Sequence, residues 1–311
     1  MTSADPLPTG PAPAAEPPAR SRRRRSPLLI VVLALIGAVV IAALAWLVVT
    51  VIQLQDVIER QTERIEQQED EISDLNDLVD ERDAFSAAMD EYRETVASVQ
   101  GVPMADIVPA DEVQALSETA WEKRRTAGSG TARAERLRAL SADIAELRTA
   151  AEAEAATNAS GTLMESVLDQ VSRGYARLTF DDVDALCERD VVGCVTSDDP
   201  YVVHFDQADM FHPSMDDWAR HYVTLHEFAH VLQYTNPVAT AAVESSFDDD
   251  WEFMADCYAL RELNAWSLHR QVWINSYEYW ENDLGYGRVC DAAQREVIAS
   301  WLAEVGVRAD G

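Results

Sequence analysis

The sequence predicts a mostly helical α+β protein with a single transmembrane helix, a helical coiled-coil stalk and a small C-terminal domain. Three observations carry this prediction: an uncharged apolar run, a heptad spacing directly after it, and a C-terminal part in which helical patterns surround one convincing strand. The expected segments are a tail (1–27), a membrane span (28–52), a coiled-coil stalk (53–84), a helical linker region (85–160) and a C-terminal domain (161–311).

The first 52 residues predict a membrane anchor. Residues 1–27 are rich in proline and alanine without apolar periodicity, so we expect a disordered tail. Leu28 to Ile52 is 25 residues without a charge, and as a helix it spans about 38 Å, more than the roughly 30 Å hydrocarbon core. A cleavable signal peptide is the alternative, but the run is long for one and lacks a clear small-residue cleavage site.

Charge predicts the orientation of this anchor and excludes one class of partner. Arginines at positions 20 and 22–25 precede the span, so the positive-inside rule predicts a single-pass cell-membrane protein with a cytoplasmic N-terminus and an extracytoplasmic C-terminal domain. The chain has 25 basic and 55 acidic residues, and because the tail holds 5 arginines and 2 acids, 20 basic and 53 acidic residues follow it. A net charge of −33 on that part disfavours nucleic-acid binding.

Apolar residues repeat every seven positions after the span. One heptad position holds Ile58, Ile65, Ile72 and Val79, and the other holds Leu54, Gln61, Gln68, Leu75 and Arg82. The β-branched residues favour a parallel homodimer through the stalk, whereas the polar residues weaken the seam and leave a single solvated helix as the alternative. Residues 85–160 keep a helical composition with breaks at 101–109 and 127–130, which indicates helical hairpins.

The C-terminal domain is long enough to bury one core. We expect helices at Leu163–Arg173 and Phe180–Cys187, a strand at Tyr201–Phe205, two helices around residues 226 and 252, and further C-terminal helices. An edge strand that precedes the residue-226 helix would pair with an extended peptide.

The pentapeptide His226-Glu227-Phe228-Ala229-His230 indicates a metal site. Two histidines four apart on a helix share one face and can bind one zinc ion, and the glutamate between them can act as a general base. The alternative is that both are core histidines, but two buried histidines and a glutamate without partners would be costly. Zn²⁺ is therefore the expected cofactor, with Glu227 as the catalytic residue.

Glu252 is the expected third ligand, because it lies on a second helix with Asp256 one turn later. Glu252 would bind the metal and Asp256 would accept a hydrogen bond from a ligating histidine. Glu244 and the run Asp248–Asp250 are the competing candidates, although the run fits better as the cap of the Glu252 helix.

These motifs resemble the gluzincin metallopeptidases, and more particularly the bacterial putative neutral zinc metallopeptidases. The resemblance covers about residues 187–262 and rests on the histidine motif followed by Gln233, on the Glu252–Cys257 segment, and on Cys187 and Cys194 before the strand. The chain departs from that family at Ala229 and Val231. The resemblance implies a small zincin-like catalytic domain in which His226, His230 and Glu252 bind zinc, Glu227 is general base and acid, and Asp256 orients His226.

Four cysteines follow the span, in a compartment that permits disulfides. Three pairings are possible, and reduced thiols are a further alternative. We favour Cys187 with Cys194, which closes a small loop, and Cys257 with Cys290, which ties the Glu252 helix to the C-terminal region.

The motifs favour a membrane-anchored zinc peptidase acting on a peptide or protein substrate. The alternative is a non-catalytic zinc-containing coiled-coil envelope scaffold or binding protein. A peptidase also needs a donor for the oxyanion, and the sequence leaves five candidates open: Tyr258, His269, Tyr277, Tyr279 and Tyr286.

Overall fold

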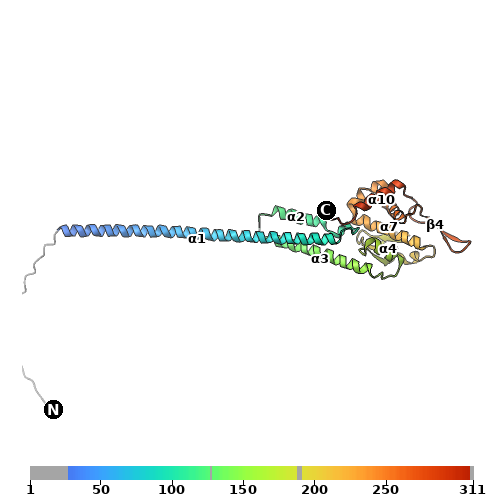
Figure 1. Ribbon diagram of the computed structural model, residues 1–311, viewed down its shortest axis with the longest axis horizontal. Helices are drawn as coiled ribbons and strands as arrows, with labels where there is room; N and C mark the ends of the chain where they lie inside the picture. The colour runs from blue at the N-terminus through green and yellow to red at the C-terminus, as the bar shows by residue number, and fades with distance from the viewer. Residues whose placement is uncertain (1–26, 127, 188–190, 309–311) are drawn as a thin grey trace, which may run out of the picture. The chain divides into compact units, whose positions relative to one another are not determined.

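The computed structural model describes residues 27–126, 128–187 and 191–308 of the chain, which is mostly helical with two small β-sheets (Figure 1). The predicted disordered tail lies, except for Pro27, outside the described residues. The chain divides into two units, residues 1–72 and residues 73–311, which we call the N-terminal and C-terminal units.

Helix α1 (Pro27–Ser98) begins with proline, whose fixed φ suits the first helical position. It is the one helix within the described ranges that is long and apolar enough to cross a membrane, and protein buries none of its apolar window. Further along, the heptad residues Leu54, Ile58, Ile65, Ile72, Leu75 and Val79 are all 52–60% exposed. The predicted apolar helix is therefore present as a candidate membrane span, and the stalk carries an apolar stripe that no described residue covers.

In the C-terminal unit, the last turns of α1 pack beside α2 (Ala110–Glu122) and α3 (Gly130–Ala155), with a short 3-10 turn at Ala105–Ile107. Glu81 of α1 accepts hydrogen bonds from the backbone N–H groups of Gly128 and Gly130, just before and at the start of α3, and Glu91 lies 3.8 Å from Arg138. The helical hairpins expected from the breaks near 101–109 and 127–130 are thus confirmed.

A three-stranded sheet has the order β1–β3–β2. β1 (Arg177–Phe180) runs parallel to β3 (Val202–Phe205), and β2 (Gly193–Val195) runs antiparallel to it, with Gly193 opposite Phe205. The predicted strand is therefore the central strand, and β2 forms an edge. The short helix α5 (Val183–Leu186) lies between β1 and β2 in sequence, and α6 (Gln207–Met210) follows β3.

The core surrounds α7 (Asp217–Thr235), which is buried along most of its length. It packs against α4 (Leu163–Ser172), α9 (Trp251–Glu262) and β2. The turn between α7 and α9 contains α8 (Pro237–Ala241) and the 3-10 segment Glu244–Phe247. α7 begins directly after Asp216, because the Asp216 side chain caps it by accepting from the backbone N–H of Ala219 at 2.8 Å.

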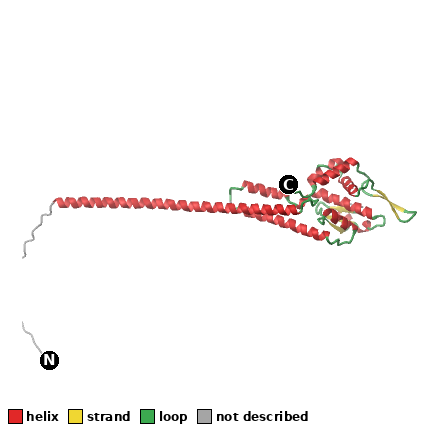
Figure 2. Cartoon of the chain, in the orientation of Figure 1, coloured by secondary structure: helices red, strands yellow, loops and turns green. Residues whose placement is uncertain are grey.

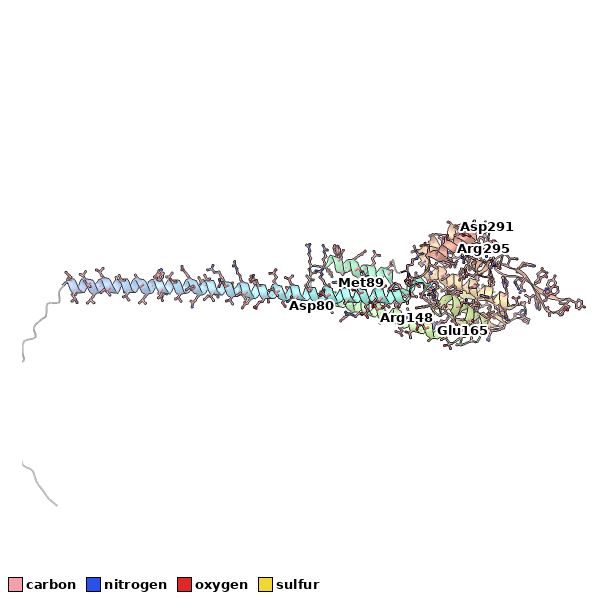
Figure 3. All side chains as sticks on the ribbon, viewed as in Figure 1. Asp80, Met89, Arg148, Glu165, Asp291 and Arg295 are labelled. Carbon is pink, nitrogen blue, oxygen red and sulfur yellow. A yellow bond between two sulfur atoms is a disulfide. The ribbon has the colours of Figure 1, made fainter. Side chains whose placement is uncertain are left out.

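After α9 the chain forms an antiparallel hairpin, β4 (His269–Trp273) and β5 (Tyr279–Asp283), and ends with α10 (Ala292–Glu304). Figure 2 shows the hairpin projecting from the helices of this unit. At the start of α10, Asp291 forms a capping box with Gln294, and Arg295 donates to the carbonyls of Ala265 and Leu260; Asp291 and Arg295 are labelled in Figure 3.

Both favoured disulfides, Cys187–Cys194 and Cys257–Cys290, are present. Two secondary-structure predictions were wrong. The helix expected at Phe180–Cys187 is short and starts only at Val183, because Phe180 ends β1 and pairs with β3. The further helices expected after α9 are a hairpin and one helix, since Asn275 turns the chain by accepting from the backbone N–H groups of Tyr277 and Glu278.

Candidate metal centre

The two histidines of the pentapeptide come from the middle of α7, where the helix is covered by protein. His226, Glu227 and His230 are 6%, 5% and 9% exposed. The predicted spacing of four residues places both imidazoles on one face, with their Nε2 atoms 3.2 Å apart. The pentapeptide is therefore part of a buried helix.

Glu252 reaches the same point from the first turn of α9. Asp250 caps that helix by accepting from the backbone N–H groups of Glu252 and Phe253 at 3.1 and 3.2 Å. The competing ligand candidates have other partners: Glu244 accepts from the Trp251 indole, and Asp248 and Asp250 pair with Arg288. Of the candidate acids, the structure brings Glu252 to the histidines.

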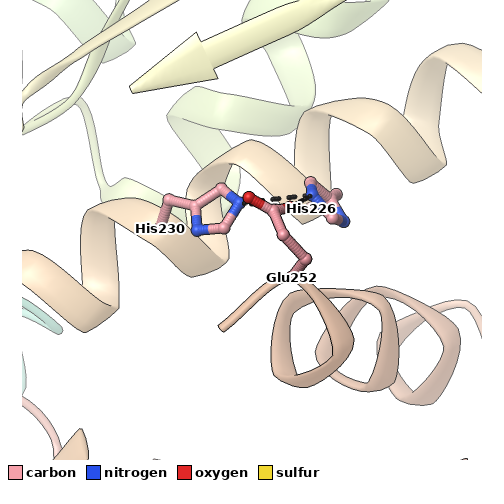
Figure 4. Close-up of side chains that lie close together, drawn as sticks. All are labelled: His226, His230 and Glu252. Carbon is pink, nitrogen blue, oxygen red and sulfur yellow. Dashed lines mark hydrogen bonds and ion pairs between the residues drawn. The ribbon is translucent and has the colours of Figure 1, made fainter. Parts of the chain in front are cut away.

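Three donor atoms form a small triangle, shown in Figure 4. Glu252 Oε2 lies 3.0 Å from His226 Nε2 and 3.2 Å from His230 Nε2. Zinc bonds of about 2.0–2.1 Å at tetrahedral angles separate ligand atoms by about 3.3 Å, close to these distances. The group His226, His230 and Glu252 could therefore hold a metal ion, and its two nitrogens and one carboxylate suit zinc.

Asp256 holds His226 from the opposite side. Its Oδ1 lies 2.9 Å from His226 Nδ1 and accepts from the hydroxyl of Tyr222, while its Oδ2 accepts from the backbone N–H of Tyr286 at 3.1 Å. Gly285 precedes Tyr286 with a φ of +69°, and a Cβ there would lie 2.5 Å from Asp256 Oδ2. Glycine is needed at this position, because the chain passes directly over the carboxylate.

Gln233 holds His230 in the corresponding way. Its Oε1 lies 2.7 Å from His230 Nδ1, and its amide nitrogen donates to the carbonyl of Trp251 at 3.0 Å. An acceptor at Nδ1 keeps the proton on that nitrogen and leaves Nε2 free as a ligand. The glutamine also ties the histidine helix to the start of α9.

The charges around the triangle favour a cation at its centre. Burial disfavours the charged form of His226, but its hydrogen bonds with Asp256 and Glu252 outweigh burial and raise its pKa to about 10. The pKa of Glu252 is lowered, because the hydrogen bonds of both histidines outweigh its burial. Without a metal, a protonated His226 therefore supplies the positive charge between the carboxylates of Asp256 and Glu252.

Glu227 stands beside the triangle and is not one of its three atoms. Its Oε2 is buried and has no hydrogen-bond partner among the described residues. Burial raises the pKa of this carboxyl, against the opposing charges of His226 and His230. A buried carboxylate oxygen without a protein partner is costly, so we infer that it faces a water molecule or a ligand.

The triangle and Glu227 line a pocket of about 360 Å³. One wall is β2 with the Cys187–Cys194 disulfide, and a Cβ on Gly193 would lie 3.2 Å from Cγ of Glu227. The strand beside the site is therefore the edge strand β2. The strand predicted at 201–205 is the central strand of the sheet, so the edge strand that precedes the residue-226 helix is β2, which the sequence did not predict.

Tyr286 is the one oxyanion-donor candidate that lines this pocket. Its ring stacks on His226 with centroids 6.0 Å apart. Burial, with the nearby charges of Glu252 and Glu227, raises the pKa of its hydroxyl, which therefore stays protonated and able to donate. The other candidates lie elsewhere: Tyr258 is buried against Phe228 and Trp301, and His269, Tyr277 and Tyr279 belong to the β4–β5 hairpin or its turn.

Sequence reasoning assigned no supporting role to Tyr222 or Gln233, although helical spacing indicates one for each. Tyr222 lies four residues before His226, and Gln233 lies three residues after His230, so both share a face with the residues they support.

Comparison of the chain with models of protein families, with curated proteins and with solved structures finds no match in any of the three. The resemblance to the neutral zinc metallopeptidases therefore stays a prediction from the motifs.

Proposed function

We propose that this chain is a membrane-anchored, extracytoplasmic zinc-dependent peptidase with Glu227 as its general base. The observation that carries the proposal is the buried Oε2 of Glu227, which has no hydrogen-bond partner among the described residues and lies beside the donor triangle of His226, His230 and Glu252. A structural metal site needs no such carboxylate, because its protein ligands already close the coordination sphere.

Each residue of the site has its own role in the proposed hydrolysis. A zinc ion bound at the triangle would lower the pKa of a ligated water molecule and polarise the substrate carbonyl. Glu227 Oε2 takes the proton from the attacking water and delivers it to the departing amine nitrogen. Tyr286 donates its hydroxyl hydrogen toward the carbonyl oxygen as negative charge develops there. Asp256 and Gln233 hold the imidazoles so that both Nε2 atoms point inward.

The substrate backbone would bind along β2. This strand is three residues long and lies at the edge of its sheet and in the wall of the pocket. An edge strand offers unpaired backbone N–H and C=O groups, which an extended peptide can satisfy as an added strand. Such pairing would place a peptide bond within reach of Glu227. For this reason we propose a peptide as the substrate, in preference to other hydrolysable groups.

The test uses the full chain, purified in detergent after treatment with a chelator and reloading with zinc. We expect about one zinc per chain by metal mass spectrometry and cleavage of peptides from a quenched fluorescent library. Glu227→Gln should keep the zinc and lose roughly 10²–10⁴-fold in turnover, whereas His230→Ala should lose both.

Glu262→Gln, the same change in the last turn of α9, is the matched control and should alter neither zinc content nor turnover. Full turnover in Glu227→Gln would overturn the mechanism. Zinc in the wild-type chain without cleavage of any library member, and with four protein ligands on the metal, would instead support a non-catalytic zinc module.

A further inference from the structure

The β4–β5 hairpin exposes a concentration of aromatic side chains outside the pocket. Residues 271–283 contain four aromatic residues, and the hairpin shares no strand with the main sheet. Trp273 is 59% exposed, Ile274 53%, and Tyr277 at the turn 91%. Figure 2 shows this hairpin standing clear of the helices of the C-terminal unit. Large apolar side chains displayed together on a projecting element indicate a binding surface.

The two faces of the hairpin differ. One face packs on the loop before α7: Arg270 pairs with Asp216 at 3.1 Å, Asn282 donates to the carbonyl of Ser214 at 2.6 Å, and the Trp280 ring meets the His212 ring. The register places the opposite pairs on the outward face, which carries Trp273 with Tyr279, Gln271 with Glu281, and His269 with Asp283. We call these six residues the outward face.

The inward contacts make the hairpin a fixed extension of the site. Arg270 also lies over the Trp218 ring, 4.4 Å from its centroid, in the first turn of the histidine helix. At the other end, β5 leads through Leu284 and Gly285 directly to Tyr286, which lines the pocket. The base of the hairpin therefore lies beside the pocket that contains the donor triangle.

The charge of the hairpin indicates which kind of peptide the outward face would bind. Residues 271–283 contain three acids, Glu278, Glu281 and Asp283, and no lysine or arginine. His269 is held between Glu281 and Asp283, and those hydrogen bonds and charges raise its pKa. The aromatic pair at the tip, with ring centroids 4.9 Å apart, offers stacking and cation–π contacts to an incoming side chain. An anionic bilayer would be repelled by the same acids.

We propose that the outward face of the β4–β5 hairpin is a docking surface for extended cationic peptide segments that carry aromatic or aliphatic side chains, and that it selects such segments as substrates. The role of these segments as substrates rests on the proposed peptidase function, whereas their binding to the outward face does not require turnover. Five strand residues at about 3.3 Å each place the tip about 17 Å from the base of the hairpin, so a peptide needs about five or six residues to span it.

The binding test uses the full chain carrying Glu227→Gln, reconstituted in nanodiscs and titrated into a fluorescent peptide of about twelve alternating lysine and phenylalanine residues. We expect saturable binding that weakens with salt. Trp273→Ala should weaken it by about tenfold or more, since exposed tryptophans dominate such interfaces. Tyr279→Ser, which removes the second ring of the Trp273–Tyr279 pair, and Glu281→Lys should each weaken it as well.

Trp121→Ala is the matched control, because Trp121 is 68% exposed on α2, outside the hairpin, and its removal should leave the affinity unchanged. A peptide with glutamate in place of lysine should not bind. Equal affinity in wild type and in all three hairpin variants would overturn the proposal, as would hairpin-dependent binding to phosphatidylglycerol vesicles in place of the peptide. Hairpin-dependent peptide binding without cleavage by the wild-type chain would leave the docking surface standing and reject the peptidase function.

Discussion

Each histidine of the donor triangle is held from behind by one polar side chain, and the two supports differ in charge. Asp256 is 1% exposed and carries a carboxylate, whereas Gln233 is fully buried and neutral. A carboxylate behind His226 increases the basicity of the ligand nitrogen, while the amide behind His230 chiefly fixes the tautomer and the ring orientation. The supporting residues therefore tune the site as well as positioning its donors.

Gln233→Ala should lower zinc affinity by about 10–100-fold, because His230 then loses the acceptor that keeps Nε2 free for the metal. Gln233→Glu, which keeps an acceptor at the same place, should restore part of the affinity. The measurement is a competition titration with a zinc chelator. The same change at the exposed Gln271 is the control, and an unchanged zinc affinity in Gln233→Ala would show that the glutamine has no role at the metal.

A second residue-scale prediction concerns Asp169 in α4. Partial burial, together with the charges of Glu165 and Glu154, raises its pKa to about 6. The folded state therefore binds this proton more tightly than the unfolded state, so the resulting stability is present below about pH 4 and is lost as the pH rises through about 6. Above that pH, the charged Asp169 destabilises the fold.

Asp169→Asn should therefore raise the melting temperature at pH 7.5 by about 1–2 °C relative to wild type, with no gain at pH 4. Thermal unfolding at both pH values measures the difference, and Asp198→Asn on an exposed loop is the control. A gain of equal size at both pH values would show that the charge of Asp169 is not its cause.

At the scale of elements, the site depends on a close contact between an edge strand and a helix. β2 lies against α7, and its residue Gly193 has no room for a side chain: a Cβ would lie 2.7 Å from the ring of the buried Phe205 and 3.2 Å from Cγ of Glu227. The Cys187–Cys194 disulfide fastens the same strand to the residues after α5. The strand and the disulfide together form the pocket wall beside Glu227.

Gly193→Ala should destabilise the C-terminal unit by about 1–3 kcal/mol, because the buried ring cannot move away. It should also reduce turnover while zinc content stays at the wild-type level, since Glu227 is not a ligand. Denaturant unfolding, metal analysis and peptide cleavage measure the three quantities. Gly37→Ala, where nothing lies within 4 Å, is the control. Loss of zinc in Gly193→Ala at full stability would contradict this assignment of the strand.

At the scale of the whole molecule, the stalk exposes a stripe of apolar side chains. Its heptad residues have no cover from the described chain, and their regular spacing fits a second copy of the same helix. We therefore propose a parallel homodimer, in which the polar residues Gln61 and Gln68 weaken the seam.

Ile65→Lys should raise the dissociation constant of this dimer by more than about tenfold, because an apolar side chain leaves the seam and a charge enters it. Gln68→Leu should lower it. Sedimentation equilibrium of the full chain in density-matched detergent measures both, and Glu66→Lys beside the seam is the control. A wild-type chain that stays monomeric at every concentration would reject the dimer.

The local patterns of the sequence determined the apolar helix, the start of α7, the placement of His226 and His230 on one face, and the cap at Asp250, because each depends on residues within a few positions of one another. The same helical spacing places Asp256 one turn after Glu252 and Gln233 one turn after His230.

Only the tertiary structure decided which acid meets the histidines, that Tyr286 lines the pocket, that β2 is the edge strand and that a hairpin follows α9. A three-residue strand is too short to show a period, and its partner is chosen by hydrogen bonds to residues distant in the chain. A loop tyrosine likewise has no pattern of its own, because its position results from the packing of Gly285 against Asp256 and Tyr222.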